Sequence, residues 1–375
     1  MKVRIGVGET RNICKAWEEM NSKRGTQMRN TLSVSLFAAG LLLAVSSSAT
    51  AQTPLRVAGN FSQNNKQVDI ERSFFEGLPK TSGVDFAVNY NPMDVVGVKA
   101  PDALRMLRGG SFDVMSVQIG MASRDDPFFE GVDLIGVATD MPALRKVVDA
   151  YREAFDQRLQ QKFNAKVLTL WPFGPQVFYC NQEISSLADL KGLKVRSFTP
   201  SMSAMLESFG ATPVTLQFSE VYPALQRGVA SCGVTSPTSG NTGNWPEVTS
   251  YLLPLSVSGS VQGHFMNLDA WNKLSTQQQT AVMAQFKTLE DQLWGLATSA
   301  NDDAIACNTG AASCANHKKF AMKLVTISDE DRQKIKAVAE NTVLPIWKKT
   351  CDAIDATCSQ TWNKTAGAAA GLTIK

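Results

Sequence analysis

Strand-like and helix-like segments alternate along most of the chain after its first fifty residues, and this alternation limits the fold more than any other feature. Short apolar runs at 55–60 and 84–90 are typical of buried strands. The stretch 142–163 carries apolar side chains at helical spacing, and long amphipathic helices are predicted from 276 to about 306 and from 329 to about 350. Strands that alternate with helices in this way predict an α/β fold.

An export signal is predicted near the start of the chain. Residues 36–45 (LFAAGLLLAV) form an apolar run that is too short to span a bilayer comfortably, and Arg29 precedes it. An A-x-A cleavage pattern ends at Ala51, so we expect cleavage after this residue and a mature N-terminus at Gln52. The predicted location of the mature protein is the periplasm.

Residues 1–27 are polar, mixed in charge and upstream of a complete signal peptide. We interpret them as an extension that results from a start codon assigned too early, with Met28 or Met20 as the true start. The signal peptide is then 28–51.

The basic character of the chain belongs to this leader. Residues 1–51 hold seven of the 37 Lys and Arg but only three of the 34 Asp and Glu, so residues 52–375 are close to neutral. The overall charge is therefore no argument for a nucleic-acid partner, and none is predicted.

Six cysteines follow the leader, an even number that in an exported protein favours disulfides. They are Cys180, Cys232, Cys307, Cys314, Cys351 and Cys358. The first two lie in strand-like runs and are expected to pair. Each of the other neighbouring pairs is separated by seven residues, which span about 10.5 Å on a continuous helix and exceed the reach of a disulfide. Local pairs therefore require a loop; otherwise the two segments cross-link, for example Cys307 to Cys358 and Cys314 to Cys351. Because C-x-x-C is absent, no metal site is expected.

The common catalytic motifs are missing from the sequence. Its two histidines, His264 and His317, are far apart and neither lies in H-E-x-x-H. There is no G-x-S-x-G, no G-x-G-x-x-G and no P-loop, and no S-x-x-K follows residue 51. We therefore predict no enzymatic activity and no cofactor, and we expect His264 to lie in the core or at the edge of a cleft.

Two stretches carry a longer signature. Residues 185–200 read SSLADLKGLKVRSFTP, and residues 214–237 read VTLQFSEVYPALQRGVASCGVTSP. The D-L-K-G-L-K-x-R turn and strand, the helix that leads to G-A-T-P-V, the F-x-E-V-Y-x-A-L-Q-x-G helix and the strand that ends in Ser-Pro resemble the solute receptors of tripartite ATP-independent periplasmic (TRAP) transporters. Weaker likeness covers most of 52–350.

The resemblance implies a two-lobed α/β periplasmic solute-binding fold, with a cleft between the lobes and a long helix that spans both. The first lobe is expected to comprise 52–172 plus about 262–300. The second is expected to comprise 173–261 plus about 301–375.

In this family an arginine on the strand after D-L-K-G-L-K clamps the ligand carboxylate, and here that position is Arg196. A guanidinium suits this role because its planar fork of donors matches a carboxylate and stays charged. Many members carry a second arginine where this chain has Gln176, and an asparagine where it has Ser236. Glutamine and serine are both neutral, so this chain lacks one cationic partner that many members have. The loss favours a ligand with one carboxylate and a hydroxyl, keto or aromatic substituent.

Further ligand-binding candidates come from both predicted lobes. The loop 235–248 offers hydrogen-bonding groups and a flat apolar side chain, although it could equally be a surface loop whose tryptophan packs on its own lobe. The resemblance adds two aromatic residues beside the cleft, of which the tyrosine could instead be core. Residues at predicted strand ends in the first lobe are also candidates, because ligands bind at the carboxyl ends of strands in open α/β sheets. These candidates are Thr235, Thr238, Ser239, Asn241, Trp245, Phe218, Tyr222, Asn60, Phe61 and Gln118.

The resulting hypothesis is a monomeric extracytoplasmic receptor that delivers a small organic acid to a TRAP-type membrane permease. The alternatives are a C4-dicarboxylate receptor, a periplasmic enzyme that acts on small organic acids, and a receptor that serves a sensor kinase or a tripartite tricarboxylate system.

Overall fold

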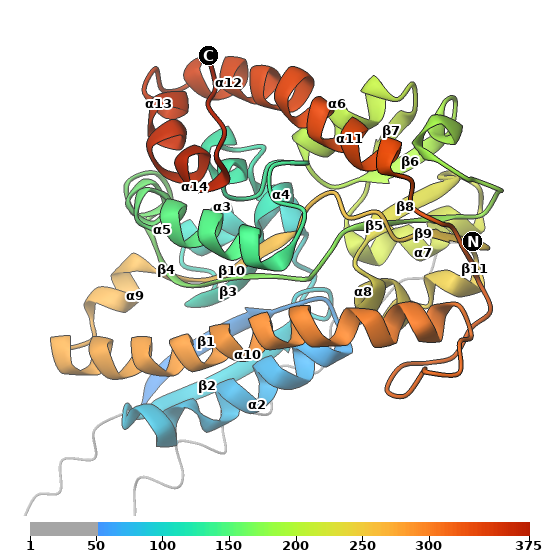
Figure 1. Ribbon diagram of the computed structural model, residues 1–375. Coiled ribbons are helices and arrows are strands. Elements are labelled where there is room, and N and C mark those ends of the chain that lie inside the picture. The colour runs from blue at the N-terminus through green and yellow to red at the C-terminus, as the bar shows by residue number, and fades with distance from the viewer. Residues whose placement is uncertain (1–51) are drawn as a thin grey trace, which may run out of the picture. The chain divides into compact units, whose positions relative to one another are not determined.

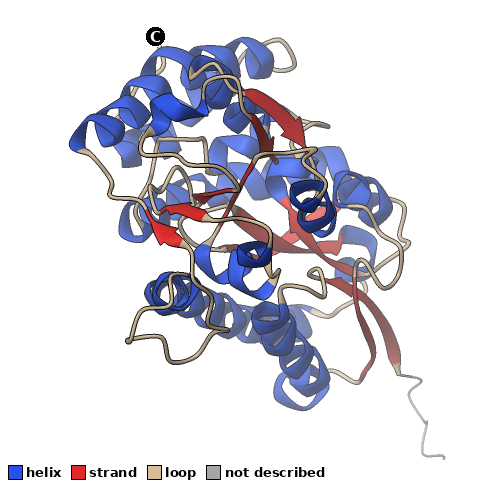
Figure 2. Cartoon of the chain, turned by 90° about the vertical axis from the view of Figure 1, so that its right-hand side faces the viewer, coloured by secondary structure: helices blue, strands red, loops and turns tan. Residues whose placement is uncertain are grey.

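The computed structural model describes residues 52–375 and contains two β-sheets with helices packed around them (Figures 1 and 2). The predicted signal peptide at 28–51 and the predicted extension at 1–27 lie outside the described residues. Within the described part, strands and helices alternate as the sequence pattern indicates, and the predicted α/β fold is confirmed.

The first sheet has five strands in the order β2-β1-β3-β10-β4. They are β1 (Thr53–Gly59), β2 (Phe86–Pro92), β3 (Val114–Gln118), β4 (Ala165–Pro172) and β10 (Val261–Asn267). Strand β1 pairs in parallel with β2 and β3, whereas β10 runs antiparallel to β3 and β4. Every residue of β3 and β10 is buried, because helices pack on both faces of this sheet.

The second sheet has six strands in the order β11-β9-β5-β8-β6-β7. They are β5 (Val177–Cys180), β6 (Lys194–Ser197), β7 (Thr212–Thr215), β8 (Cys232–Thr235), β9 (Tyr251–Leu253) and β11 (Lys323–Leu324). Strand β6 pairs in parallel with β7 and β8, and β5 runs antiparallel to β8 and β9. The shorter helices of this half are α6 (Pro200–Ser208), α7 (Phe218–Gln226) and α8 (Pro237–Thr242).

Three long helices frame the first sheet. They are α2 (Asn65–Ser82), α5 (Met141–Phe163) and α10 (Thr276–Asn308). A capping box starts α10, since the Ser275 side chain accepts from the Gln278 backbone N–H and the Gln278 side chain accepts from the Ser275 N–H. Along its length α10 packs on β4 and α2, and near its end it packs on α8 beside the second sheet (Figure 1). The predicted long helix that contacts both halves is therefore confirmed. Shorter helices near the first sheet are α3 (Ala103–Arg108), α4 (Ile119–Ala122) and α9 (Leu268–Asn272).

The helix predicted from 329 to about 350 is interrupted. It consists of α11 (Asp329–Val338), a π-helical turn at Ala339–Val343 and α12 (Leu344–Asp352). Pro345 explains the interruption, because proline lacks the N–H that would bond to the carbonyl of Asn341 and its ring crowds that carbonyl.

The C-terminal helices α13 (Cys358–Trp362) and α14 (Ala368–Ala370) follow α12. The indole N–H groups of Trp347 and Trp362 donate to the backbone oxygens of Pro127 and Gly131, at 2.8 Å and 2.9 Å. These contacts join a segment of the predicted second lobe to elements of the predicted first lobe. In residues 52–375, no helix is both long enough and apolar enough to cross a membrane.

Two segments that run side by side connect the sheets. Residues 173–176 lead from β4 to β5, and residues 254–260 lead from β9 to β10. They are paired through backbone hydrogen bonds, including Phe173 N–H to Ser260 O at 3.2 Å and Gln176 N–H to Ser258 O at 2.9 Å. The lobe boundaries predicted from the resemblance lie next to these segments, and the division of the chain at those residues stays a prediction.

All six cysteines after the leader are paired. Strands β5 and β8 place Cys180 opposite Cys232 in register, and the expected disulfide between them is confirmed. The other two bridges are local, Cys307–Cys314 and Cys351–Cys358, rather than cross-links between the two segments. The loop that local pairing requires is present in both cases, because α10 and α12 each end one residue after their first cysteine.

The disulfides are expected to stabilise the protein unequally. Because a longer closed loop removes more entropy from the unfolded chain, replacing Cys180 and Cys232 by alanine should lower the free energy of unfolding by about 4 kcal/mol for a separation of 52, against about 2 kcal/mol for the separation of seven between Cys351 and Cys358. All four side chains are fully buried, so the packing losses are comparable. Urea denaturation of the oxidised variants measures the difference, and an equal or reversed order would contradict it.

Candidate functional site

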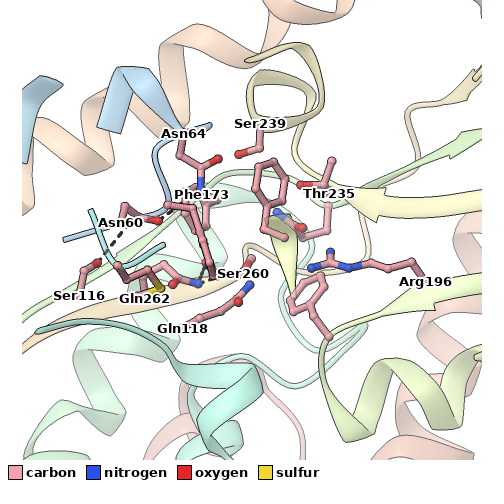
Figure 3. A pocket seen from close by; sticks show the side chains of 15 residues that line it. Asn60, Asn64, Ser116, Gln118, Phe173, Arg196, Thr235, Ser239, Ser260 and Gln262 are labelled. Atoms are coloured by element: carbon pink, nitrogen blue, oxygen red, sulfur yellow. Dashed lines mark hydrogen bonds between the residues drawn. The ribbon is translucent and has the colours of Figure 1, made fainter. Parts of the chain in front are cut away.

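A narrow, nearly closed pocket lies between the two sheets (Figure 3). The first sheet and its neighbouring loops contribute Asn60, Phe61, Asn64, Met93, Ser116, Gln118 and Gln262; the second half contributes Arg196, Phe198, Phe218, Thr235 and Ser239; and the connecting segments contribute Phe173, Gln176 and Ser260. The lining contains one cationic side chain and no carboxylate. The pocket is therefore suited to a small ligand that carries negative charge.

Strand ends position much of this lining. Asn60 directly follows β1, Gln118 is the last residue of β3 and Thr235 is the last residue of β8. The carboxyl ends of strands in an open α/β sheet face a crevice where ligands bind, and here both sheets direct such ends toward the same space. The first-sheet candidates Asn60, Phe61 and Gln118 thus lie in the pocket.

Arg196 on β6 is the cation in the pocket, and its side chain is almost completely buried. Its Nε donates to Leu216 O at 3.0 Å and its Nη1 donates to Val234 O at 2.7 Å, while the guanidinium lies 4.6 Å from the centre of the Phe198 ring. Its Nη2 has no hydrogen-bond partner among residues 52–375. Two carbonyls therefore fix the guanidinium plane and leave one donor group for a ligand.

The charge of Arg196 is not neutralised within the described residues. Burial lowers the pKa of Arg196 to about 9, which still leaves the guanidinium charged at neutral pH, and Glu220 favours that charged form only from a distance. No carboxylate in residues 52–375 forms an ion pair with it. By contrast, the buried Arg158 contacts both Asp126 and Asp355, at 2.7 Å and 2.6 Å. Because a buried cation without a partner is costly, Arg196 is poised to bind an anion.

Gln176 lies in the connecting segment and lines the pocket. Its Nε2 donates to Gly174 O at 2.9 Å. Gly174 has a φ of +116°, and a Cβ there would come within 2.3 Å of the Asn301 side chain on α10. A glycine is therefore required where the first connecting segment passes α10.

Two carboxylates, on the buried Glu130 and the partly buried Asp133, support the same region from behind the pocket. Glu130 accepts from Ser201 N–H at 2.8 Å, and Asp133 accepts from Val261 N–H at 3.0 Å, next to the pocket residue Ser260. Burial raises the pKa of Glu130, and burial raises the pKa of Asp133 to about 7 despite its backbone hydrogen bonds. These groups hold the start of α6 and the second connecting segment in place.

Five predicted ligand residues lie outside the pocket lining and have other partners. The Ser236 hydroxyl caps α8 by accepting from Ser239 N–H. Thr238 donates to Asn301 and Asn241 donates to Asn308, so both attach α8 to α10. Contact of these residues with a ligand stays a prediction.

Trp245 and Tyr222 complete this group of five. Trp245 is buried and stacks on Phe218, with 5.5 Å between the ring centres, so Phe218 forms the pocket wall and Trp245 supports it from behind. The Tyr222 hydroxyl donates to Glu247 at 2.9 Å near the surface. Both rings are therefore engaged by their own half of the protein.

Sequence reasoning missed seven lining residues. They are Asn64, Met93, Ser116, Phe173, Phe198, Ser260 and Gln262. The rule on strand ends could have indicated Phe198, which directly follows β6, and Phe173, which directly follows β4. The others have no local signal, since their position depends on how distant segments pack.

One cluster in residues 52–375 combines side-chain types that bind metals: Asp303, Cys307 and His317. Cys307 is bonded to Cys314, and its sulfur is therefore not available as a thiolate ligand. The remaining pair is joined directly, with 2.6 Å between His317 Nδ1 and Asp303 Oδ2.

Comparison with protein families gives one extended match. A family described as "Bacterial extracellular solute-binding protein, family 7" matches residues 62–350. The chain is 28% identical over 190 residues to the sialic acid-binding periplasmic protein SiaP of Vibrio cholerae, which covers 50% of this chain and 58% of SiaP. It is 27% identical over 220 residues to the C4-dicarboxylate-binding periplasmic protein DctP of Rhodobacter capsulatus, which covers 56% of this chain and 65% of that protein. These matches span less than two thirds of either relative.

Solved structures share the fold. DctP7, a Bordetella pertussis extracytoplasmic solute receptor binding pyroglutamic acid, superposes with a TM-score of 0.73 at 20% identity, over 83% of this chain and 99% of that one. A TRAP periplasmic solute-binding protein from Shewanella oneidensis with bound succinate gives 0.71 at 18% identity, over 85% of this chain and all of that one. The two-lobed arrangement implied by the sequence resemblance is thus the fold of these proteins.

Proposed function

Because the chain belongs to the bacterial extracellular solute-binding protein family 7, the TRAP periplasmic solute-binding proteins, we propose that it is a receptor for a small organic acid that it delivers to a TRAP-type permease. This family consists of solute-binding proteins and not of enzymes. Residues 62–350 carry the family match and include the whole of the pocket lining except Asn60 and Phe61.

The observation that supports this proposal most strongly is the unpaired guanidinium of Arg196. Its Nη2 is buried, lacks a partner among residues 52–375 and belongs to the only cation in the pocket lining. A carboxylate that binds there gains charge-assisted hydrogen bonds and neutralises a buried charge. Arg196 is therefore the proposed carboxylate clamp.

The charge of the pocket favours a ligand with a single carboxylate. The lining offers one positive charge, and its other polar groups are amides and hydroxyls, including Gln176 and Thr235. A second carboxylate would have to leave water without a cationic partner, and such burial is unfavourable. One relative named for C4-dicarboxylates and one structure with bound succinate make a dicarboxylate the competing candidate.

The arrangement of the pocket also suggests how binding is signalled. Both sheets contribute lining residues, and two paired segments, 173–176 and 254–260, connect them. A ligand that contacts both halves stabilises their closed arrangement over an open one. We propose that the permease recognises this closed form in the periplasm.

A thermal-shift screen of the purified protein tests the proposal. We expect one or more monocarboxylates to raise the melting temperature, because a ligand at one hundred times its Kd adds about 2.7 kcal/mol to the free energy of unfolding. The methyl esters of the same acids, which lack the charge, serve as controls and should have no effect. A panel in which dicarboxylates are the stronger ligands would favour the competing candidate, and a panel in which no organic acid stabilises the protein would contradict the proposal.

A further inference from the structure

A chain of buried polar contacts extends from Glu71 on α2 to Asn64 at the pocket. Glu71 Oε2 accepts from Asn60 N–H at 2.8 Å, and Glu71 Oε1 lies 3.3 Å from Asn60 Nδ2. Asn60 Oδ1 in turn accepts from Asn64 Nδ2 at 3.3 Å. All three side chains are at least 97% buried, so each contact is made away from water.

Glu71 is held as a carboxylate. Besides Asn60, it accepts from the Tyr90 hydroxyl at 2.8 Å and contacts His264 Nε2 at 3.0 Å. Burial by itself would raise the pKa of Glu71, but the hydrogen bonds and charge of His264, together with the bonds from Asn60 and Tyr90, hold that pKa below its usual value. An ionised carboxylate only accepts hydrogen bonds.

This carboxylate fixes the orientation of two amides. Asn60 must present its NH₂ group to Glu71, which places its Oδ1 toward Asn64. Asn64 must then present its own NH₂ group to Asn60, because two facing oxygens cannot share a hydrogen bond. The Oδ1 of Asn64 is left as a buried acceptor with no partner among residues 52–375, and it points into the pocket toward the side where Ser239 lies (Figure 3).

We infer that Asn64 Oδ1 selects ligands that carry a hydrogen-bond donor, a hydroxyl or an N–H, on the side away from the Arg196-bound carboxylate. The inference rests on the proposed function and narrows its ligand class to hydroxy acids and acids with an N–H group, excluding oxo groups at this position. An oxo oxygen there would face a second acceptor and leave both unpaired. Glu71 acts through Asn60 as a positioning residue.

Calorimetry with matched acids tests this selection. The probes are hydroxy acids of three to six carbons paired with their oxo counterparts, such as lactate with pyruvate and 3-hydroxybutyrate with acetoacetate. We expect the hydroxy acid of the best-binding pair to bind about 10-fold to 100-fold more tightly than its partner. Asn64→Ala should reduce that ratio to nearly one. Glu71→Gln should also reduce the ratio, because a glutamine side chain can donate as well as accept and therefore no longer fixes the orientation of the Asn60 amide.

Two controls keep the test decisive. Asn89→Ala removes an exposed asparagine of β2 outside the pocket and should preserve the ratio. Asn64→Ala leaves every contact of Glu71 in place, so it decides the inference even if Glu71→Gln destabilises the protein. A protein in which no hydroxy acid binds more tightly than its oxo partner, or an Asn64→Ala variant that keeps the preference, overturns the inference while carboxylate binding still supports the proposed function. Absence of binding by every acid overturns both.

Discussion

Arg196→Ala is expected to weaken binding of the organic acid by about 2–5 kcal/mol, the range typical of removing one partner of a buried, hydrogen-bonded charge pair. The reason is that the pocket lining contains no other cation, so no neighbour can replace the lost guanidinium. The variant should still fold, because Arg196 forms no ion pair within the described residues and its removal eliminates an uncompensated buried charge. Isothermal calorimetry measures the affinity, and circular dichroism checks the fold.

Two further variants separate charge from geometry. Arg196→Lys keeps a positive charge but loses the planar fork, so it should retain part of the affinity. Arg227→Ala removes an exposed arginine from the same half of the protein and should leave binding unchanged. Unchanged affinity in Arg196→Ala would eliminate the carboxylate clamp.

Trp245→Ala is expected to lower the free energy of unfolding by about 3–5 kcal/mol, as for other fully buried large aromatic side chains. The ring stacks on Phe218, meets Tyr179 edge-on at 5.7 Å and lies 5.8 Å from the Arg196 guanidinium. Its loss leaves a cavity directly behind the pocket wall, so affinity for the acid should also fall. Urea denaturation and calorimetry on the same preparation measure the two effects.

Comparing the loss of stability with the loss of affinity shows whether Trp245 supports the pocket wall or contacts the ligand directly. Trp245→Phe keeps an aromatic ring against Phe218 and should recover most of the stability and most of the affinity. If Trp245→Ala instead lost affinity without losing stability, the tryptophan would be a direct ligand contact, as the sequence pattern alone suggested.

Local patterns predicted the larger elements well, because amphipathic periodicity and capping act over neighbouring residues. The capping box at Ser275 starts α10 where the sequence indicated, and β6 places Arg196 where the resemblance implied. The π-helical turn before Pro345 was missed, although the proline itself was a signal for irregular hydrogen bonding.

The pocket was only partly predictable, because it is assembled from segments far apart in the sequence. Asn64 and Gln262 are separated by almost two hundred positions yet line the same space, and nothing around either residue indicates this. Trp245 was predicted to form an aromatic wall of the cleft. Its ring instead packs against Phe218 and lies behind the pocket wall, and this packing could not be read from the sequence. The cysteine connectivity stayed open for a similar reason, since it depended on helix ends that periodicity locates only to within a residue or two.

The most direct test of the central claim is a crystal structure of the protein with the acid that stabilises it most in the thermal-shift screen. We expect the acid to lie between the two sheets, with its carboxylate within hydrogen-bonding distance of Arg196 Nη2 and with contacts from both halves of the protein. An acid bound outside this pocket, or one inside it whose carboxylate points away from Arg196, would contradict the claim.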